Sequence, residues 1–257
     1  NLKAIFSLGA GVDHVFQDPH VPQVPIVRIV SPDLTMRMTE YIVWQVLDHH
    51  RMGSKYRQQQ RHKIWLEDRA QPAAHQVTVG FLGLGVLGTD AARKVASLGF
   101  NVTGWSRTPR YSHDVTCFFG EEQLPWFLAT VDILVCLLPL TPQTRGMLSK
   151  SLFDRMKKGG VFGAPILINA GRGGLQNEKD ILLALNSGTL SAATLDVFNT
   201  EPLPQSDPLW SHPNVSVTPH CAASSAPDQL AAPIAAQMDA FERGEPLRNV
   251  VNREAQY

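Results

Sequence analysis

The chain has 257 residues, and its content of 44% hydrophobic and 18% charged residues is typical of a globular protein with a sizeable core. Basic and acidic residues balance to a formal net charge of +0, which excludes a global field that would attract nucleic acid or an anionic membrane and leaves small molecules as the expected partners. Three cysteines without metal-ligand spacing, and no apolar run of membrane-spanning length, favour a cytoplasmic protein without a metal site.

The first part of the chain predicts two short strands, a turn and a long helix. Residues 3–8 and 24–30 have the apolar content of buried strands. The first of them ends in a glycine-rich turn at residues 9–13, which could hold a carboxylate on its exposed backbone amides or form a plain turn. Residues 34–52 show helical periodicity, and the polar stretch 58–76 is interpreted as a surface connection.

Residues 77–88 predict a buried strand, a glycine turn and a helix start in immediate succession. Gly83 permits a tight turn, Gly85 lets the backbone approach a pyrophosphate, and Gly88 lets the helix pack against the strand. The start of such a helix presents unpaired N–H groups and the positive end of its dipole to an anion. An ordinary glycine-rich turn is the alternative, but the flanking strand and helix favour a dinucleotide cradle.

The end of the next strand, residues 101–105, indicates which cofactor binds. An NAD-binding fold normally places an acidic residue there to accept hydrogen bonds from the ribose hydroxyls. This chain has Ser106 and Arg107 instead, with Arg110 beyond them. A hydroxyl and a guanidinium bind a 2′-phosphate that a carboxylate would repel. NADP(H) is therefore preferred, with NAD(H) still possible; the alternative is that these arginines are merely solvated.

Alternating strands and helices continue along the rest of the chain. We expect a helix at 121–129, strands at 132–138, 166–170, 193–197 and 215–217, and a helix at 225–243 that Pro233 kinks or shortens. This alternation predicts a doubly wound parallel sheet of the Rossmann α/β class. In such sheets, ligands bind beyond the carboxyl ends of the strands.

Three polar residues follow strand ends in the second half of the chain: Arg172, Glu201 and His220. Each alone is more often structural than catalytic. Together at the carboxyl edge of the sheet, they supply what reduction of a 2-keto acid requires. Arg172 can grip the substrate carboxylate and polarise the keto oxygen, and His220 can protonate that oxygen, with its charged form favoured by a neighbouring carboxylate.

Motifs spread along the whole chain resemble those of the D-isomer-specific 2-hydroxyacid dehydrogenases, most closely the glyoxylate/hydroxypyruvate reductase A type. The matching stretches are residues 2–13, Met38-Thr-Glu-Tyr41, 83–88, Trp105-Ser-Arg-Thr108, Leu138-Pro-Leu-Thr-Pro142, Asn169-Ala-Gly-Arg-Gly173, 195–204 and Thr218-Pro-His220. The resemblance implies a homodimeric, NADPH-dependent reductase that converts glyoxylate, hydroxypyruvate or a related small 2-keto acid to the D-2-hydroxy acid.

The resemblance also implies roles for individual residues. Arg172 binds the substrate, His220 is the general acid/base in contact with it, and Glu201 orients the imidazole, while the amides of Ala10 and Gly11 hold the substrate carboxylate. The residues expected to bind the cofactor are Gly83, Gly85, Val86, Leu87, Gly88, Ser106, Arg107, Thr108, Arg110, Leu138, Pro139, Thr144, Ala170, Gly171 and Asp196. Of these, Asp196 is expected against the nicotinamide side.

The resemblance further divides the chain into parts. Residues 1–35 are expected to be the remainder of a flavodoxin-like substrate domain, residues 36–222 the NAD(P)-binding Rossmann domain, and residues 223–257 a C-terminal helix that returns to the substrate domain. Family members carry further residues ahead of the position that matches Asn1. We therefore expect a truncated chain whose substrate domain is incomplete at its N-terminal side.

The sequence leaves two questions open. Segment 159–165 is longer than the link usual in the family, so it either forms a surface bulge or shifts the register of the next strand and turns Arg172 to the wrong face. The function also has alternatives: a dinucleotide-sensing, corepressor-like binding protein on the same scaffold, or a fragment that binds nucleotide without catalysis.

Overall fold

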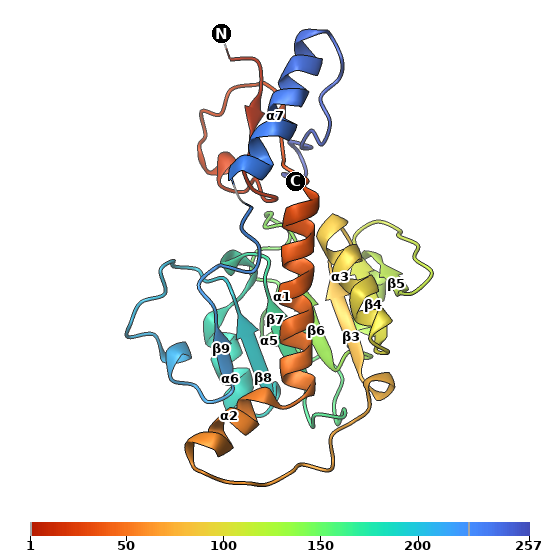
Figure 1. Cartoon of the computed structure of the whole chain (residues 1–257), viewed down its shortest axis with the longest axis vertical. Helices are drawn as coiled ribbons and strands as arrows, with labels where there is room; N and C mark the ends of the chain where they lie inside the picture. The colour runs from red at the N-terminus through yellow and green to blue at the C-terminus, as the bar shows by residue number, and fades with distance from the viewer. Residues whose placement is uncertain (1, 226) are drawn as a thin grey trace.

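A sheet of seven parallel strands forms the larger part of the molecule, and a two-stranded parallel sheet lies beyond one end of it (Figure 1). The structure, a computed structural model, describes residues 2–225 and 227–257. Two residues that enter the sequence expectations lie outside the described residues: Asn1, ahead of which we expect missing chain, and Ala226, inside the expected helix 225–243.

The large sheet has the strand order β5-β4-β3-β6-β7-β8-β9, with every neighbouring pair parallel. Its strands are β3 (Thr78–Leu82), β4 (Asn101–Ser106), β5 (Thr116–Phe119), β6 (Ile133–Cys136), β7 (Ile166–Asn169), β8 (Ala192–Leu195) and β9 (Val215–Val217). The chain order reverses between β3 and β6, which makes the sheet doubly wound. The predicted Rossmann class is thus confirmed, and in such sheets the cleft for a nucleotide opens at this switch point.

Seven α-helices and four short 3-10 helices connect the strands in the described part of the chain. The α-helices are α1 (Pro32–His50), α2 (Gly53–Arg61), α3 (Val86–Ser97), α4 (Gly120–Leu128), α5 (Lys150–Phe153), α6 (Glu178–Asn186) and α7 (Pro227–Glu242). The 3-10 helices are η1 (Val15–Gln17), η2 (Ala74–Gln76), η3 (Gly173–Leu175) and η4 (Pro208–Trp210). None of the helices in these residues is long and apolar enough to cross a membrane.

The long helix α1 begins and ends two residues earlier than the expected range 34–52, and its N-terminus is capped. The Ser31 hydroxyl accepts a hydrogen bond from the Leu34 amide at 3.1 Å, and Pro32 occupies the first helical turn, where its missing N–H has no helical partner to lose. Near the other end of the helix, His49 Nε2 lies 2.8 Å from Thr194 Oγ1 on β8, and burial lowers the pKa of His49 to about 4. The ring is therefore neutral near pH 7 and fixes the helix to the sheet without a buried charge.

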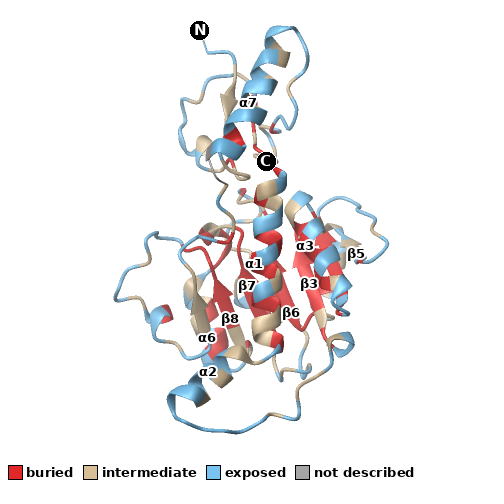
Figure 2. Cartoon of the chain, in the orientation of Figure 1, coloured by how far each residue is buried: buried red, intermediate tan, exposed pale blue. Residues whose placement is uncertain are grey.

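Each face of the sheet has its own apolar core. The central strands between the two cores are buried (red in Figure 2). In β6, Ile133 and Val135 face the core shared with α1 and α3, whereas Leu134 and Cys136 face the core shared with α4, α5 and α6. Both faces of the strand are buried because helices cover the sheet on both sides, which explains the unbroken apolar runs in the sequence.

Several elements were not expected from the sequence, among them helix α6, although it buries Ile181, Ala184 and Leu185. The expected connection 58–76 is wrong at its start, because α2 extends to Arg61; this helix buries no residue, so no apolar periodicity could reveal it. The edge strand β5 was not expected either. It pairs with β4 from Thr116 to Phe119, and none of its residues is fully buried, so its pattern lacks the apolar run of the central strands.

The small part of the molecule combines segments from both ends of the sequence. Here β1 (Ile5–Phe6) pairs with β2 (Ile26–Val27), and Val250 bridges to Val27 from the end of the chain. Both strands are shorter than the expected runs 3–8 and 24–30. Helix α7 lies beside them (Figure 1), yet of its expected apolar face Leu230 is buried and Met238 exposed. That face is only partly covered by the described residues.

The long segment 159–165 forms a turn at the surface rather than a shift in register. The amide of Gly163 donates to the carbonyl of Gly160 at 2.9 Å, and Phe162 packs against the core. The strand that follows pairs with β6 residue for residue, beginning with Ile166 opposite Ile133. Of the two outcomes left open by the sequence, the structure has the surface bulge, and Arg172 keeps its face.

Candidate active site

The glycine turn between β3 and α3 has the geometry of a phosphate cradle. Gly83 has a φ of 102°, and a Cβ on Gly88 would lie 1.9 Å from the carbonyl oxygen of Gly83, so the turn and the close packing both require glycine. A Cβ on Gly85 would meet nothing within 4 Å, and no side chain caps the N-terminus of α3. The open space in front of Gly85, with the free amides of Val86 and Leu87 behind it, fits a pyrophosphate group.

The end of β4 presents two exposed arginines. The Ser106 hydroxyl donates to the carbonyl of Thr108 at 2.7 Å, which fixes the loop and leaves the exposed Arg107 and Arg110 as the cations. Arg107 also donates a hydrogen bond from Nη2 to the hydroxyl of Tyr257. This contact could not be predicted from local sequence patterns, because the two residues are 150 positions apart.

Loops from two further strands, β6 and β7, lie at the same edge. A Cβ on Gly83 would lie 2.9 Å from the carbonyl oxygen of Leu137 after β6, and a Cβ on Gly171 after β7 would lie 3.0 Å from that of Leu138. The Thr144 hydroxyl donates to the carbonyl of Pro139 at 2.7 Å and so holds the β6 loop in place. The expected cofactor residues of β3, β6 and β7, with Ala170 beside Gly171, therefore lie on neighbouring loops.

Arg172 lies against the glycine-rich turn that follows β1. Its Nε donates to Asp13 Oδ1 at 2.9 Å, and its Nη1 donates to the carbonyl of Gly171 at 2.9 Å. A Cβ on Gly11 would lie 2.0 Å from Arg172 Nη2, so the guanidinium rests directly on this backbone. The amides of Ala10 and Gly11 have no hydrogen-bond partner among residues 2–225 and 227–257. A guanidinium beside two free amides makes a site for a carboxylate.

His220 and Glu201 form a hydrogen-bonded pair. His220 Nδ1 lies 2.7 Å from Glu201 Oε2, while Glu201 Oε1 accepts from the amide of Phe198 at 2.9 Å. The carboxylate is thus fixed by the backbone and can hold the Nδ1–H tautomer, which directs Nε2 away from Glu201. His220 has a φ of 51°, in the left-handed region, and its own amide donates to the carbonyl of Asp196 at 2.8 Å.

The buried Asp196 organises the turn that carries His220. Its carboxylate accepts hydrogen bonds from the Thr218 hydroxyl at 2.6 Å and from the amides of Cys221 at 2.9 Å and Ala222 at 3.0 Å. Because Thr218 donates to Asp196, Tyr41 donates in turn to Thr218 at 2.7 Å, and burial raises the pKa of Tyr41 so that its hydroxyl stays protonated. Burial likewise raises the pKa of the Cys221 thiol.

The three expected catalytic residues therefore lie at one edge of the sheet. Arg172 and His220 follow β7 and β9, which flank β8, and all three strands run in the same direction. A Cβ on Gly173 would lie 1.9 Å from the carbonyl oxygen of Phe198, so the loop of Arg172 touches the loop that fixes Glu201. The contacts that the sequence did not indicate are those of Asp13, Tyr41, Thr218 and Tyr257, each made to a residue far away in the chain.

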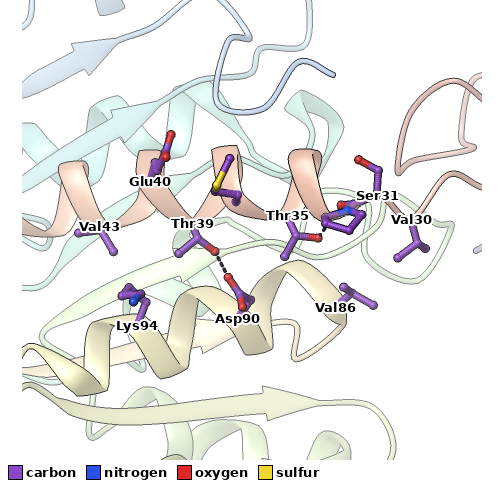
Figure 3. Close-up of a pocket in the computed structure, with 11 residues that line it drawn as sticks. Val30, Ser31, Thr35, Thr39, Glu40, Val43, Val86, Asp90 and Lys94 are labelled. Atoms are coloured by element: carbon purple, nitrogen blue, oxygen red, sulfur yellow. Dashed lines mark hydrogen bonds between the residues drawn. The ribbon is translucent and has the colours of Figure 1, made fainter. Parts of the chain in front are cut away.

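A groove of about 780 Å³ lies between α1 and α3 (Figure 3). Its lining includes Val30, Thr35, Val43 and Lys94, and Thr39 donates a hydrogen bond to Asp90 across it at 2.6 Å. None of the three expected catalytic residues lines the groove, but Val86, one of the expected cofactor residues, does.

A doubly wound parallel sheet with a glycine cradle and an Arg, Glu and His set at its carboxyl edge defines the class of nicotinamide-nucleotide-dependent dehydrogenases. Comparison with known families agrees: residues 43–222 match the model described as D-isomer specific 2-hydroxyacid dehydrogenase, NAD binding domain. The chain belongs to the D-isomer-specific 2-hydroxyacid dehydrogenase family.

Individual relatives narrow this similarity. A glyoxylate/hydroxypyruvate reductase A of Yersinia enterocolitica is 42% identical over 254 residues, which cover 96% of this chain and 79% of the relative. One similar solved structure is the NADPH-dependent glyoxylate/hydroxypyruvate reductase of Sinorhizobium meliloti in complex with NADP and sulfate. Its TM-score is 0.97 at 49% identity, and the match covers 100% of this chain and 80% of that chain. A probable 2-hydroxyacid dehydrogenase of Rhizobium etli, solved with NADP, HEPES and L(+)-tartaric acid, has a TM-score of 0.96 and 48% identity at the same coverage.

Proposed function

We propose that this protein reduces glyoxylate, hydroxypyruvate or a related small 2-keto acid to the D-2-hydroxy acid with NADPH. The observation that carries the proposal is the Glu201–His220 pair, with 2.7 Å between carboxylate and imidazole, at the sheet edge that also presents Arg172. A histidine whose Nδ1 is held by a fixed carboxylate can donate a proton from Nε2. The reductase names and NADP complexes of the relatives support the same reaction.

Each side chain has a distinct part in the proposed reaction. NADPH held at the glycine cradle supplies the hydride. Arg172, with the amides of Ala10 and Gly11, binds the substrate carboxylate and orients the keto group, since a guanidinium and free amides are complementary to a planar anion. His220 donates its proton to the keto oxygen, and Glu201 stabilises the imidazolium before that transfer.

For the cofactor residues, we propose that the backbone from Gly83 to Gly88 binds the pyrophosphate and that Arg107 binds the 2′-phosphate. Thr108 and Arg110 extend this cationic surface, and the β6 and β7 loops line the rest of the cleft. The carboxylate of Asp196 accepts hydrogen bonds from Thr218, Cys221 and Ala222. We therefore propose that Asp196 contributes on the nicotinamide side by holding the turn of His220 in place.

The proposed domain division follows the two sheets. Residues 36–222 would hold the cofactor, and residues 1–35 with 223–257 would contribute to a substrate domain. Support comes from the pairing of β1 with β2, the bridge from Val250 to Val27 and the match of the NAD-binding family model to residues 43–222. Because α1 begins at Pro32, the boundary at residue 35 falls in its first turn.

A homodimer and a cytoplasmic location complete the proposal. Ile64, Trp65 and Leu66 are three consecutive exposed apolar residues after α2, and a second copy of this chain is the partner we propose for them. The cysteines Cys117, Cys136 and Cys221 are all free thiols, which suits the reducing cytoplasm.

The test is the oxidation of NADPH by the purified chain with glyoxylate and with hydroxypyruvate, followed by absorbance. His220→Asn is the informative variant, because asparagine tolerates the left-handed backbone at this position. We expect it to lose activity by about 10²- to 10⁴-fold, the contribution of a general acid, while NADPH still binds. Absence of turnover by the wild type on 2-keto acids, or full activity of the variant, would contradict the proposal.

A further inference from the structure

Arg107 and Tyr257 form a close pair that the reaction itself does not require. The guanidinium carbon of Arg107 lies 5.0 Å from the centre of the Tyr257 ring, and Nη2 donates to the Tyr257 hydroxyl. The side chain of Tyr257 therefore contacts the guanidinium twice, through its ring and through the hydrogen bond to its hydroxyl. Such a contact restricts a long, flexible side chain to one arrangement.

Tyr257 is itself held by the small sheet. Two bonds anchor its segment to β2 and the residues before it: the amide of Val251 donates to the carbonyl of Ile26 at 2.8 Å, and Nη2 of Arg253 donates to that of Val24 at 2.7 Å. The segment then turns back, with the amide of Asn252 donating to the carbonyl of Tyr257 at 3.2 Å. These hydrogen bonds hold the segment that places the Tyr257 ring beside Arg107.

The charge of Arg107 is not neutralised by a neighbouring carboxylate. No acidic side chain lies within 4.0 Å of its guanidinium in the part of the chain that the structure describes. Tyr257 supplies a ring face and a hydroxyl, neither of which removes the positive charge. The remaining N–H groups of Arg107, at the end of β4 where a nucleotide ribose binds, stay available to an anion.

We propose that Tyr257 is a positioning residue for the 2′-phosphate of NADP(H). It holds the Arg107 guanidinium by stacking, so that the free N–H edge is preorganised for a phosphate and less side-chain freedom is lost on binding. This inference rests on the proposed NADPH dependence. It assigns part of the cofactor preference to a residue outside the Rossmann sheet, carried by the segment that pairs with β2.

The experiment measures the binding of two cofactor fragments by calorimetry, so that no turnover is needed. 2′,5′-ADP carries the 2′-phosphate and 5′-AMP does not. We expect Tyr257→Ala to weaken 2′,5′-ADP by about five- to tenfold and to leave 5′-AMP unchanged, since only the former contacts Arg107 through a phosphate. Tyr257→Phe keeps the ring and is expected to restore most of the lost affinity.

Tyr56→Ala is the matched control, because Tyr56 is a partly buried tyrosine on α2 whose hydroxyl accepts a hydrogen bond from the amide of Asp68. It should change neither affinity. Equal weakening of both fragments by Tyr257→Ala, no weakening of either, or equal losses in the Ala and Phe variants would each overturn the positioning role. A wild type that binds 2′,5′-ADP no more tightly than 5′-AMP would instead contradict the NADPH preference itself, and the inference with it.

Discussion

At the scale of single residues, the site depends on hydrogen bonds that join the ends of neighbouring strands. Asp196, after β8, holds the turn after β9 through Thr218 and the amides of Cys221 and Ala222. The left-handed backbone of His220 is one product of this arrangement. Because strain of this kind persists only where the surroundings enforce it, the orientation of the imidazole is set by the fold before any substrate arrives.

Replacing Glu201 by glutamine tests the charge of this pair rather than its shape. The amide oxygen of Gln can still accept from the Phe198 backbone, but its neutral NH2 group then faces Nδ1 and can only donate, so it stabilises an imidazolium less than a carboxylate does. We expect Glu201→Gln to lower kcat/KM for glyoxylate reduction by about 10²-fold, with NADPH affinity within about twofold of the wild type. Steady-state kinetics and a fluorescence titration of NADPH measure the two quantities. Unchanged kcat/KM would show that the carboxylate contributes no charge to the reaction.

Residue types at strand ends could be predicted from the sequence, but their partners could not. Arg172, Glu201 and His220 stand out because each follows an apolar strand in a parallel sheet, whose carboxyl ends share one edge. Asp13 pairs with Arg172 across 159 positions, and no spacing rule connects them. The predicted roles of all these residues stay predictions until the variants are measured.

At the scale of whole elements, the sequence succeeds where burial imposes a pattern. The central strands β6 and β7 are buried along their whole length, and the expected ranges 132–138 and 166–170 contain them. Helix α2 and strand β5 lie at the surface and have no fully buried residue, so neither leaves a periodic signal. Burial is not sufficient for a correct prediction, because helix α6, which buries Ile181, Ala184 and Leu185, was not predicted either.

Two glycines of the cradle should respond differently to alanine. Gly88→Ala places a methyl group 1.9 Å from the backbone oxygen of Gly83, so we expect a loss of about 1–3 kcal/mol in the free energy of unfolding. Gly85→Ala adds its methyl group to open space at a φ of −74°, which alanine adopts readily, so stability should hold. Its methyl group would occupy the space proposed for the pyrophosphate, so NADPH affinity should fall.

Thermal unfolding and NADPH titration of the two variants separate stability from binding. Gly88→Ala is expected to lower Tm, whereas Gly85→Ala is expected to keep the wild-type Tm and to weaken NADPH by at least about tenfold, the loss expected when close backbone approach is blocked. A Gly85→Ala variant that binds NADPH as tightly as the wild type would show that the phosphate does not approach this backbone, and would count against the cradle.

At the scale of the whole molecule, two contacts join the small part to the large sheet. Asp13 reaches Arg172 at the proposed substrate end of the cleft, and Tyr257 reaches Arg107 at the proposed ribose end. Each pair uses a guanidinium proposed to bind an anionic ligand, so the same cations would also hold the two parts together. These two contacts therefore hold the small part at both the proposed substrate end and the proposed ribose end. Local sequence patterns do not predict such contacts, because the paired residues are 159 and 150 positions apart.

A substitution in the exposed apolar segment Ile64, Trp65 and Leu66 tests the proposed dimer. In a two-fold symmetric dimer each side chain is buried twice, and burial of a large apolar side chain contributes about 1.5–3 kcal/mol. Trp65→Ser should therefore weaken self-association by about 10²- to 10⁴-fold. Sedimentation velocity should give twice the 28.3 kDa chain mass for the wild type and a shift toward the monomer for the variant.

The control is Tyr111→Ser, which removes another exposed aromatic side chain and should leave the dimer intact. A monomeric wild type, or a Trp65 variant that dissociates no more than this control, would contradict the proposed interface.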